Sequence, residues 1–394
     1  MSSSRLIEIA GLFLKLGTIG FGGPAAHIAM MEEEVVERRQ WLTREHFLDL
    51  LGATNLIPGP NSTEMAIHVG YTRGGLPGLA IAGICFIFPA VTITAALAAI
   101  YVAFGALPQA EWLLLGIKPA VLAVILGALW RLGKKAIKTW KLAVIGAIVA
   151  ALLMAGLNEV GALLVGGAVG MVWLRLSNRD ATENAANLVL GTLLSGIALR
   201  VAAATAGDRP ADAAPLWQLG LAFLKVGCVL FGSGYVLVAF LEGEVVARGW
   251  LTQQQLLDAI ALGQFTPGPV LSTATFVGYT MAGWSGALVA TLGIFLPSFI
   301  FVAVLNPLVP RLRRSPWTAA FLDAVNASAV ALMAVVTVRL GYATLLQPNV
   351  NAIAIVTAAI AAVLLFRFRL NSAWIVLFGA AVGGGATALI STGG

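Results

Sequence analysis

The stretch "LIPGPNS" runs from Leu56 to Ser62, and "FTPGPVLS" runs from Phe265 to Ser272. Each places a Pro-Gly-Pro triplet inside an otherwise apolar segment. Proline has no backbone N–H to donate and clashes with the preceding helical turn, so the triplet ends one helical segment and begins another. The sequence therefore predicts two broken helices, one in each half of the chain.

The composition is that of a membrane protein. Of the 394 residues, 59% are hydrophobic and only 11% are charged. Apolar runs such as 76–104, 113–130 and 284–309 reach the length that crosses about 30 Å of hydrocarbon. We expect an all-α polytopic membrane protein. The N-terminal segment lacks a small-residue cleavage site, so we expect no removable signal peptide.

Other classes of protein have little support in the sequence. The net charge of +6 comes from short basic clusters between apolar segments, which does not favour a nucleic-acid partner. Cys85 and Cys228 lie in apolar surroundings and lack the spacing of a metal site. No nucleotide-binding motif occurs. We therefore expect no cofactor and no bound metal, and an energy source in ion gradients.

The chain contains an internal repeat. "FLKLGTIGFGGP", which begins at Phe13, matches "FLKVGCVLFGSG", which begins at Phe223. "EEVVERRQWLT" from Glu33 likewise matches "GEVVARGWLT" from Gly243, and the two Pro-Gly-Pro triplets follow. This predicts a first repeat at 1–174, a connector at 175–215 with one apolar helix at 187–204, and a second repeat at 216–394. Each repeat has about six hydrophobic segments.

The basic loops predict that the two repeats are inverted. "RLGKKAIKTWK" from Arg131 is strongly basic, but its counterpart from Arg339 is not, and "RLRRS" from Arg311 shows the opposite bias. Cytoplasmic loops collect Lys and Arg, so we expect the N-terminus in the cytoplasm and the C-terminus in the periplasm. Inverted repeats are typical of secondary transporters, whose site lies at mid-depth between the halves. The sequence leaves open whether the first two segments of each half cross the membrane or turn back. Full crossings would give thirteen spans.

The broken helices are the candidate binding site. The helix after a break starts with its positive end, which attracts anions, and neutral donors nearby suit an oxyanion. The substrate-binding candidates are groups beside the breaks and two repeat-related lysines: Asn55, Gly59, Asn61, Ser62, Thr63, Gln264, Gly268, Ser272, Thr273, Lys15 and Lys225. The helix-breaking residues are Pro58, Pro60, Pro267 and Pro269. The alternatives are kinks that serve packing and lysines that reach the membrane interface.

The most polar part of each repeat is a candidate gate. It contains matching acidic, basic and aromatic residues: Glu34, Arg38 and Trp41 in the first half, and Glu244, Arg248 and Trp250 in the second. Ion pairs that rearrange would open and close access, and the alternative is an amphipathic connector with interfacial tryptophans.

Several ionisable groups are not matched by an ionisable group in the other repeat. His27, Glu64 and His68 occur only in the first half. The sequence is compatible with two roles for them, coupling of transport to protons or packing in the protein interior. Lys118, which aligns with Asn326, and Asp323 are further one-sided candidates, whereas the paired Arg131 and Arg339 are interpreted as anchors at span ends.

Taken together, these motifs resemble the chromate ion transporter family in its long two-domain form. The resemblance rests on Phe21, Gly22, Gly23, Pro24, Glu34, Arg38, Trp41, Leu42 and Pro58 to Pro60, and on Phe231, Gly232, Gly234, Glu244, Trp250, Leu251 and Pro267 to Pro269. It implies export of chromate, or a sulfate-like oxyanion, across the bacterial inner membrane. We expect lipid around the protein and consider a homodimer. The alternative functions are an oxyanion channel, a transporter mainly for sulfate and, with the least support, a membrane oxidoreductase.

Overall fold

The computed structural model describes residues 3–21, 23–104, 108–176, 215–306, 315–346, 352–368 and 370–392. All regular secondary structure in these ranges is helical, which confirms the expected all-α class. The helix expected at 187–204, Gly22 of the first glycine motif and the basic residues 311–314 lie outside the described residues.

The first half comprises α1 (Ser3–Ile19), α2 (Pro24–Glu32), the π-helical turn η1 (Glu33–Arg38), α3 (Arg44–Thr54), α4 (Asn61–Phe104), α5 (Pro108–Ala136), α6 (Trp140–Met154) and α7 (Glu159–Leu176). The second half comprises α9 (Leu216–Val229), η2 (Gly234–Val236), α10 (Leu237–Leu241), the π-helical turn η3 (Glu242–Val246), α11 (Gln253–Phe265), η4 (Val270–Ser272), α12 (Thr273–Leu305), α14 (Pro316–Leu345), α15 (Ala352–Arg367) and α16 (Ser372–Thr392). The same pattern of short, broken helices followed by a long one occurs in both halves.

The first segment of each half turns back on itself. α1 ends at Ile19, and α2 begins with Pro24 after the glycine-rich break. Lys15 Nζ lies 2.7 Å from Glu34 Oε1, which is possible only if α2 and η1 run back beside α1. Lys225 and Glu244 form the equivalent ion pair in the second half.

The second segment of each half also turns back, at its Pro-Gly-Pro break. The guanidinium of Arg73 lies over the ring of Trp41, 5.0 Å from its centroid, so the start of α3 meets the far end of the helical stretch 61–73. Arg73 also pairs with Glu8 of α1 at 3.5 Å. In the second half, a Cβ on Gly263 would lie 2.3 Å from Thr273 Oγ1 across the break. In both repeats, therefore, this segment doubles back as a hairpin.

The long helices α4 and α12 each contain a sharp reversal. In α4 the backbone leaves helical geometry at Gly74 (φ −143°) and Gly75 (φ 56°), and α12 does so at Ala282 and Gly283. A Cβ on Gly70 would lie only 2.4 Å from the carbonyl oxygen of Gly78, so the stretches on either side of the turn pack against each other. The positive φ explains the glycines at these turns.

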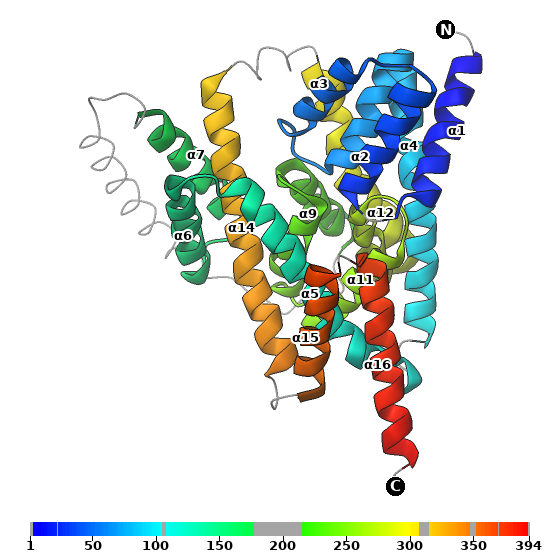
Figure 1. Cartoon of the computed structure of the whole chain (residues 1–394), viewed down its shortest axis with the longest axis vertical. Coiled ribbons are helices and arrows are strands. Elements are labelled where there is room, and N and C mark those ends of the chain that lie inside the picture. The colour runs from blue at the N-terminus through cyan, green and yellow to red at the C-terminus, as the bar shows by residue number, and fades with distance from the viewer. Residues whose placement is uncertain are drawn as a thin grey trace.

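The equivalent long helices run in opposite directions. In Figure 1, α4 continues downward to its C-terminal end low in the view, whereas α12 ends high, near α3. α14 descends from the upper left, whereas the matching α5 climbs toward it. The N-terminus lies at the top and the C-terminus at the bottom. This is the inverted arrangement that the loop charges predict.

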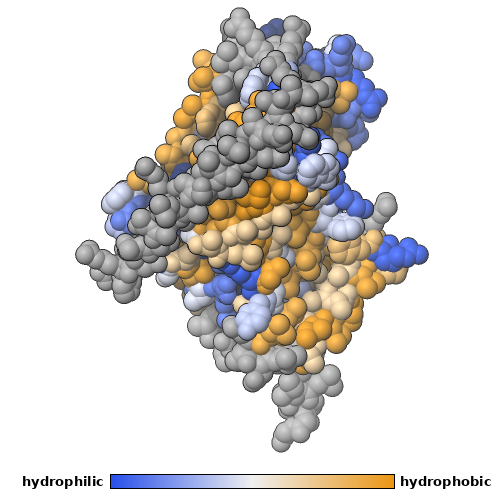
Figure 2. All heavy atoms as spheres, turned by 90° about the vertical axis from the view of Figure 1, so that its left-hand side faces the viewer, coloured by the Kyte–Doolittle hydropathy of each residue, from blue (hydrophilic) through white to orange (hydrophobic). Residues whose placement is uncertain are grey.

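The outer surface of the helices suits lipid. Phe88 in α4 and Leu288 in α12 are 58% and 61% exposed, in the middle of long apolar helices. Five of the described helical stretches are long and apolar enough to cross a membrane: Asn61–Phe104, Gly116–Ala136, Glu159–Leu176, Val270–Val304 and Pro316–Leu345. The first and fourth of these include the reversals in α4 and α12. Figure 2 shows apolar atoms over the middle of one face and hydrophilic atoms toward the N-terminal end. Such extensive outward apolar surface fits a bilayer.

Candidate functional site

The polar motif of each repeat positions the helix that leads to the break. In "WLT" the threonine is the N-cap of the next helix: Thr43 accepts from the amide of His46, and Thr252 forms a full capping box with Gln255. The caps start α3 and α11, which then run toward the Pro-Gly-Pro loops.

Each Pro-Gly-Pro loop is joined by a backbone hydrogen bond to the glycine-rich break of the other repeat. The Gly59 N–H donates to the carbonyl of Leu230 at 2.7 Å, and the Gly268 N–H donates to the carbonyl of Gly20 at 2.8 Å. Gly20 and Leu230 are equivalent positions, just after the first helix of each repeat. Each Pro-Gly-Pro loop therefore contacts the first break of the other repeat, as a two-fold relation between the halves requires.

Both central glycines are required by their backbone. Gly59 has φ +146° and Gly268 has φ +87°, conformations that residues with a side chain rarely adopt. A Cβ on Gly268 would also lie 2.9 Å from that of Ala90. The loops therefore sit in tight packing at the contact between the repeats, and the flanking prolines fix their direction.

A cavity of about 390 Å³ lies beside the Pro-Gly-Pro break of the first repeat, between the repeats. Its walls come from the first Pro-Gly-Pro loop, the C-terminal part of α5 with the loop after it, α14 and the glycine-rich break after α9. The lining residues are Thr54, Asn55, Leu56, Ile57, Asn61, Leu132, Lys135, Ala136, Lys138, Gly232, Val236, Ala319, Leu322, Asp323, Asn326, Ala329 and Val330.

The polar wall of this cavity contains amides, two lysines and one carboxylate. Asn61 Nδ2 donates to Asn55 Oδ1 at 3.1 Å, so these two predicted residues act as a unit. Lys138 Nζ pairs with Asp323 Oδ1 at 2.9 Å. Lys135 adds a second ammonium group. Amide N–H groups and ammonium groups are the donors that an oxyanion needs.

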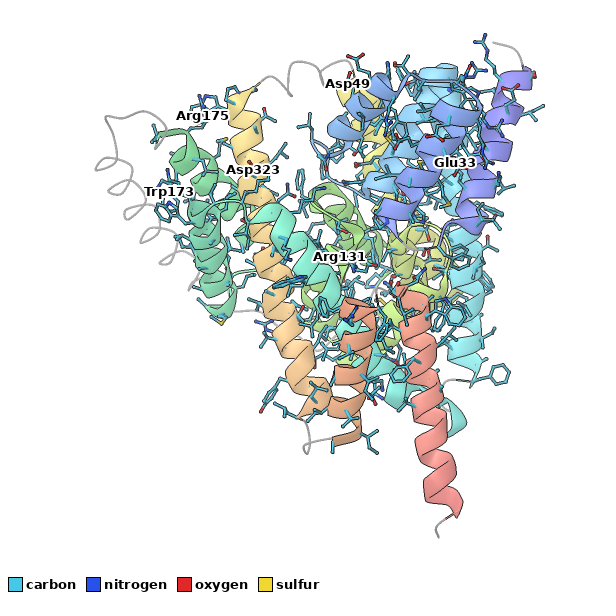
Figure 3. The ribbon with its side chains drawn as sticks, viewed as in Figure 1. Glu33, Asp49, Arg131, Trp173, Arg175 and Asp323 are labelled. Carbon is cyan, nitrogen blue, oxygen red and sulfur yellow. The ribbon has the colours of Figure 1, made fainter. Side chains whose placement is uncertain are left out.

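Sequence reasoning missed part of this wall. Lys135 and Lys138 belong to the basic loop whose sequence pattern indicates only membrane orientation, and the structure brings both to the cavity. Asp323, a one-sided candidate in the sequence, and Asn326, which aligns with Lys118, also line it. Figure 3 shows Asp323 on α14, with Arg131 on α5 close to mid-height. Arg339, the repeat partner of Arg131, pairs with Glu242 at 3.3 Å.

The second Pro-Gly-Pro break contributes no residue to this cavity, although the sequence places binding candidates beside both breaks. Gln264 is buried, and its Oε1 accepts from the hydroxyl of Tyr235 at 3.5 Å. Ser272 accepts from Thr94 of α4 at 3.2 Å, and Thr273 donates to the carbonyl of Val270. The side-chain nitrogen of Gln264 is buried and has no hydrogen-bond partner. Gln264 is buried, whereas its repeat counterpart Asn55 is exposed, so the two breaks differ in access.

Ser62 and Thr63 follow the first break but do not line the cavity. Both are buried, and the Thr63 hydroxyl has no hydrogen-bond partner. Of the substrate-binding candidates, only Asn55 and Asn61 line the cavity directly.

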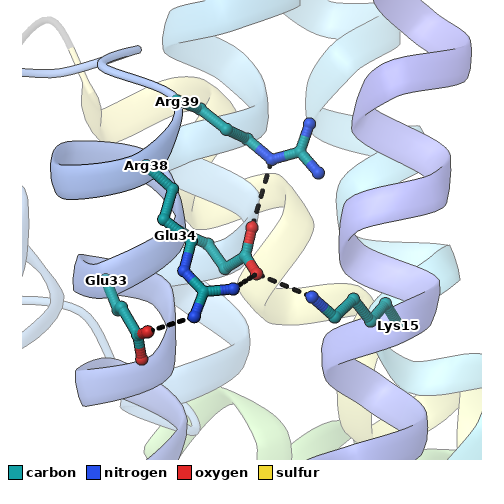
Figure 4. A network of polar contacts seen from close by, with 5 residues as sticks. All are labelled: Lys15, Glu33, Glu34, Arg38 and Arg39. Atoms are coloured by element: carbon teal, nitrogen blue, oxygen red, sulfur yellow. Dashed lines mark hydrogen bonds and ion pairs between the residues drawn. The ribbon is translucent and has the colours of Figure 1, made fainter.

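The predicted gate and the two predicted lysines form one ion-pair cluster in each repeat. Figure 4 shows the first, in which Glu34 pairs with Lys15 at 2.7 Å, Arg38 at 3.4 Å and Arg39 at 3.2 Å. Glu34 is nearly buried within η1. The hydrogen bond from Lys15 is the main reason that the pKa of Glu34 lies below the ordinary carboxyl value, and Arg39 adds to it.

The second cluster repeats this arrangement. Glu244, buried within η3, pairs with Lys225 and Arg248. Lys15 and Lys225 therefore neutralise glutamates beside the hairpins and do not reach the cavity. π-Helical turns are uncommon and often mark functional sites, and here both place the central carboxylate.

The two gate tryptophans stack with arginines. Arg39 and Arg73 lie over Trp41, at 5.4 and 5.0 Å from the ring centroid, and Arg248 lies over Trp250 at 5.1 Å. The stacking connects each ion-pair cluster to the start of α3 or α11.

Comparison with known proteins agrees with the broken helices and the repeated polar motif. The chromate transporter family model matches residues 7–171 and again 217–384, once for each half. The chain belongs to the chromate transporter family. It is a multi-pass membrane protein of this family, and both copies of the motif lie within the matched residues.

Similar proteins span nearly the whole chain. The chromate transport protein of Cupriavidus metallidurans is 32% identical over 380 residues, which cover 96% of this chain and 92% of that protein. A chromate transport protein of Pseudomonas aeruginosa is 33% identical over 348 residues, covering 86% and 81%. A probable chromate transport protein of Synechococcus elongatus is 32% identical over 339 residues, covering 85% and 84%. No solved structure matches the chain.

Proposed function

We propose that this protein is a secondary transporter that exports chromate from the cytoplasm, with the oxyanion bound in the cavity beside the first Pro-Gly-Pro break. The observation that carries the proposal is the cavity wall. It draws Asn55, Asn61 and Lys138 from one repeat and Asn326 from the other. A site lined by both halves changes shape when the halves move relative to each other, which alternating access needs.

The membrane potential supplies enough energy for export. Moving one charge through 100 mV is worth about 2.3 kcal/mol, and chromate carries two negative charges out of a cell that is negative inside. No nucleotide hydrolysis is needed. The clusters around Glu34 and Glu244 would act as gates on opposite sides, since they occupy equivalent positions in inverted repeats.

Transport assays on the purified protein test the proposal. The protein is reconstituted into liposomes, and entry of labelled chromate and labelled sulfate is followed with and without an imposed potential. We expect saturable chromate flux that follows the potential and exceeds sulfate flux. Flux that rises linearly with concentration would indicate a channel, and faster sulfate flux would indicate a sulfate transporter. No flux of either anion would contradict the proposed function.

A further inference from the structure

Glu64 is a carboxyl group without a counter-charge in the interior. It lies in the first turn of α4, directly after the break, and is 0% exposed. Neither of its carboxyl oxygens has a hydrogen-bond partner. An ionised carboxylate that is buried without donors is strongly disfavoured, so Glu64 holds a proton in this conformation.

The carboxyl group of Glu64 lies where the two repeats touch. A Cβ on Gly59 would be 2.4 Å from Glu64 Oε1 and 2.4 Å from Ser298 Oγ of α12, so both groups face the same point of the loop. Ser298 is fully buried, and its hydroxyl has no hydrogen-bond partner. Glu64 is one helical turn beyond Asn61, which lines the cavity.

His68 lies one turn further along the same helix. It is 0% exposed, and neither ring nitrogen makes a hydrogen bond of good geometry, although the side chain of Asn306 lies near the ring. The helical stretch continues to Arg73 at the hairpin end. Glu64 and His68 thus form a line of two titratable groups from the break toward the end of the molecule that holds the N-terminus.

The elements around Glu64 offer it no ion pair. The stretch 76–104 and α12 contain no Asp, Glu, Lys, Arg or His. In α1, Glu8 and Lys15 pair with Arg73 and Glu34, and Arg5 is exposed. In α2, His27 bonds to the carbonyl of Gly20 at 2.8 Å, and Glu32 pairs with Arg44 at 3.2 Å. In α11, Asp258 accepts from the hydroxyl of Tyr101 at 2.9 Å. The charged and titratable groups of α3 are all exposed: Arg44, Glu45, His46 and Asp49.

We propose that Glu64 is the proton-binding residue of the transporter, that His68 passes protons to it, and that one proton travels in the same direction as each oxyanion. This rests on the proposed function. An ionised Glu64 would repel a dianion one turn away in a medium of low dielectric constant, whereas the protonated form does not. By linkage, proton binding and oxyanion binding then strengthen each other, which is the condition for symport. Export remains favoured by the potential, because one net negative charge still leaves.

The direction of coupling is tested in proteoliposomes with the potential clamped at zero. Labelled chromate is equal on both sides, and the outside is made acidic. Chromate movement in the Glu64→Gln variant measures the part that arises because chromate itself takes up protons on the acidic side. Relative to this variant, we expect net chromate uptake by the wild-type protein, with a pH-driven component about tenfold larger. Net chromate loss relative to the variant would indicate antiport, and equal movement would indicate no coupling at Glu64. Both outcomes would overturn the proposal.

Matched variants separate chemistry from folding. Glu64→Asp keeps a titratable group and should retain pH-driven uptake at a reduced rate. His68→Asn should slow the approach to the same final level, because it removes a relay and not the proton site. Glu45→Gln removes an exposed carboxylate and should behave as wild type. If Glu64→Asp loses coupling as completely as Glu64→Gln while still exchanging chromate, the assignment to the carboxyl group is wrong.

Infrared spectroscopy gives a readout that does not depend on transport. The purified wild-type protein at neutral pH should show the band of a protonated carboxyl group that is absent from Glu64→Gln. Identical spectra would overturn the proposal even if chromate is transported. Conversely, a wild-type protein that moves no chromate but shows the band would refute the proposed function while leaving Glu64 protonated.

Discussion

The amide of Gly59 donates a 2.7 Å hydrogen bond to the carbonyl of Leu230, and this bond joins the Pro-Gly-Pro loop of one repeat to the first break of the other. The equivalent bond in the other direction joins the amide of Gly268 to the carbonyl of Gly20, so each repeat holds the other at two points. A movement of one repeat against the other must therefore pass through these loops. This places the breaks where the two repeats would move against each other.

Substitution of the central glycine tests this role. Gly59→Ala should abolish transport, because the new Cβ meets Glu64 Oε1 and Ser298 Oγ at 2.4 Å and φ is +146°. A strained backbone of this kind costs about 1–3 kcal/mol, so the melting temperature in detergent should also fall. Gly11→Ala, on α1 with no atom within 4 Å of the new Cβ, is the control and should be neutral or slightly stabilising. Normal transport by Gly59→Ala would contradict the packing described.

The amide pair of the cavity should set chromate affinity. We expect Asn55→Ala or Asn61→Ala to raise the KM for chromate about fivefold to tenfold, because each removes a hydrogen bond worth roughly 1 kcal/mol. The double variant should be less than additive, since the two side chains bond to each other at 3.1 Å. Gln254→Ala, an exposed amide on α11, provides the control. An unchanged KM in all variants would move the site away from this cavity.

Removal of the cavity carboxylate should improve binding. Asp323→Asn deletes a negative charge from the wall and releases Lys138, its partner at 2.9 Å. The KM for chromate should fall about threefold to tenfold at low salt, with a smaller effect at high salt because of screening. Stability should change by less than about 1 kcal/mol, since the side chains of Lys138 and Asp323 are 59% and 40% exposed. A higher KM would show that Asp323 helps to hold the site together.

The ion-pair cluster at Glu34 should make stability depend on pH. Its pKa is lowered in the folded protein, mainly by Lys15, so the stabilisation is present above the ordinary carboxyl value and is lost as pH falls through the lowered pKa. Glu34→Gln should lower stability at neutral pH by about 1–2 kcal/mol and flatten the acid side of the profile of melting temperature against pH. Glu37→Gln, an exposed neighbour, should leave the profile unchanged. Parallel wild-type and Glu34→Gln profiles would argue against the cluster.

The inverted repeats predict that the two termini lie on opposite sides of the membrane. Single cysteines placed before α1 and after α16, in a chain without Cys85 and Cys228, should react with an impermeant thiol reagent from opposite sides of oriented vesicles. We expect the N-terminal site to be reached from the cytoplasmic side, where basic loops collect. Labelling of both sites from one side would contradict the inversion.

The amino-acid sequence by itself determined the helical class, the repeat and the places where helices break. These features follow from local chemistry: an apolar run must form a helix in lipid, and the Pro58 to Pro60 triplet cannot continue one. The opposite charge bias of equivalent loops also fixed the expected inversion. The sequence could not choose between crossings and hairpins, because both have the same apolar length.

Only the tertiary structure decided which groups meet. Lys15 resembled a ligand for an anion, but the fold places it against Glu34, whereas the basic loop residues Lys135 and Lys138 reach the cavity. Gln264 at the second break is buried, whereas its repeat counterpart Asn55 is exposed, so repeat-related positions differ in access. Such pairings depend on how hairpins pack across the repeat interface, where contacts join residues far apart in the chain. The local sequence pattern does not encode these long-range contacts. For the same reason, only the three-dimensional structure shows that Glu64 is buried.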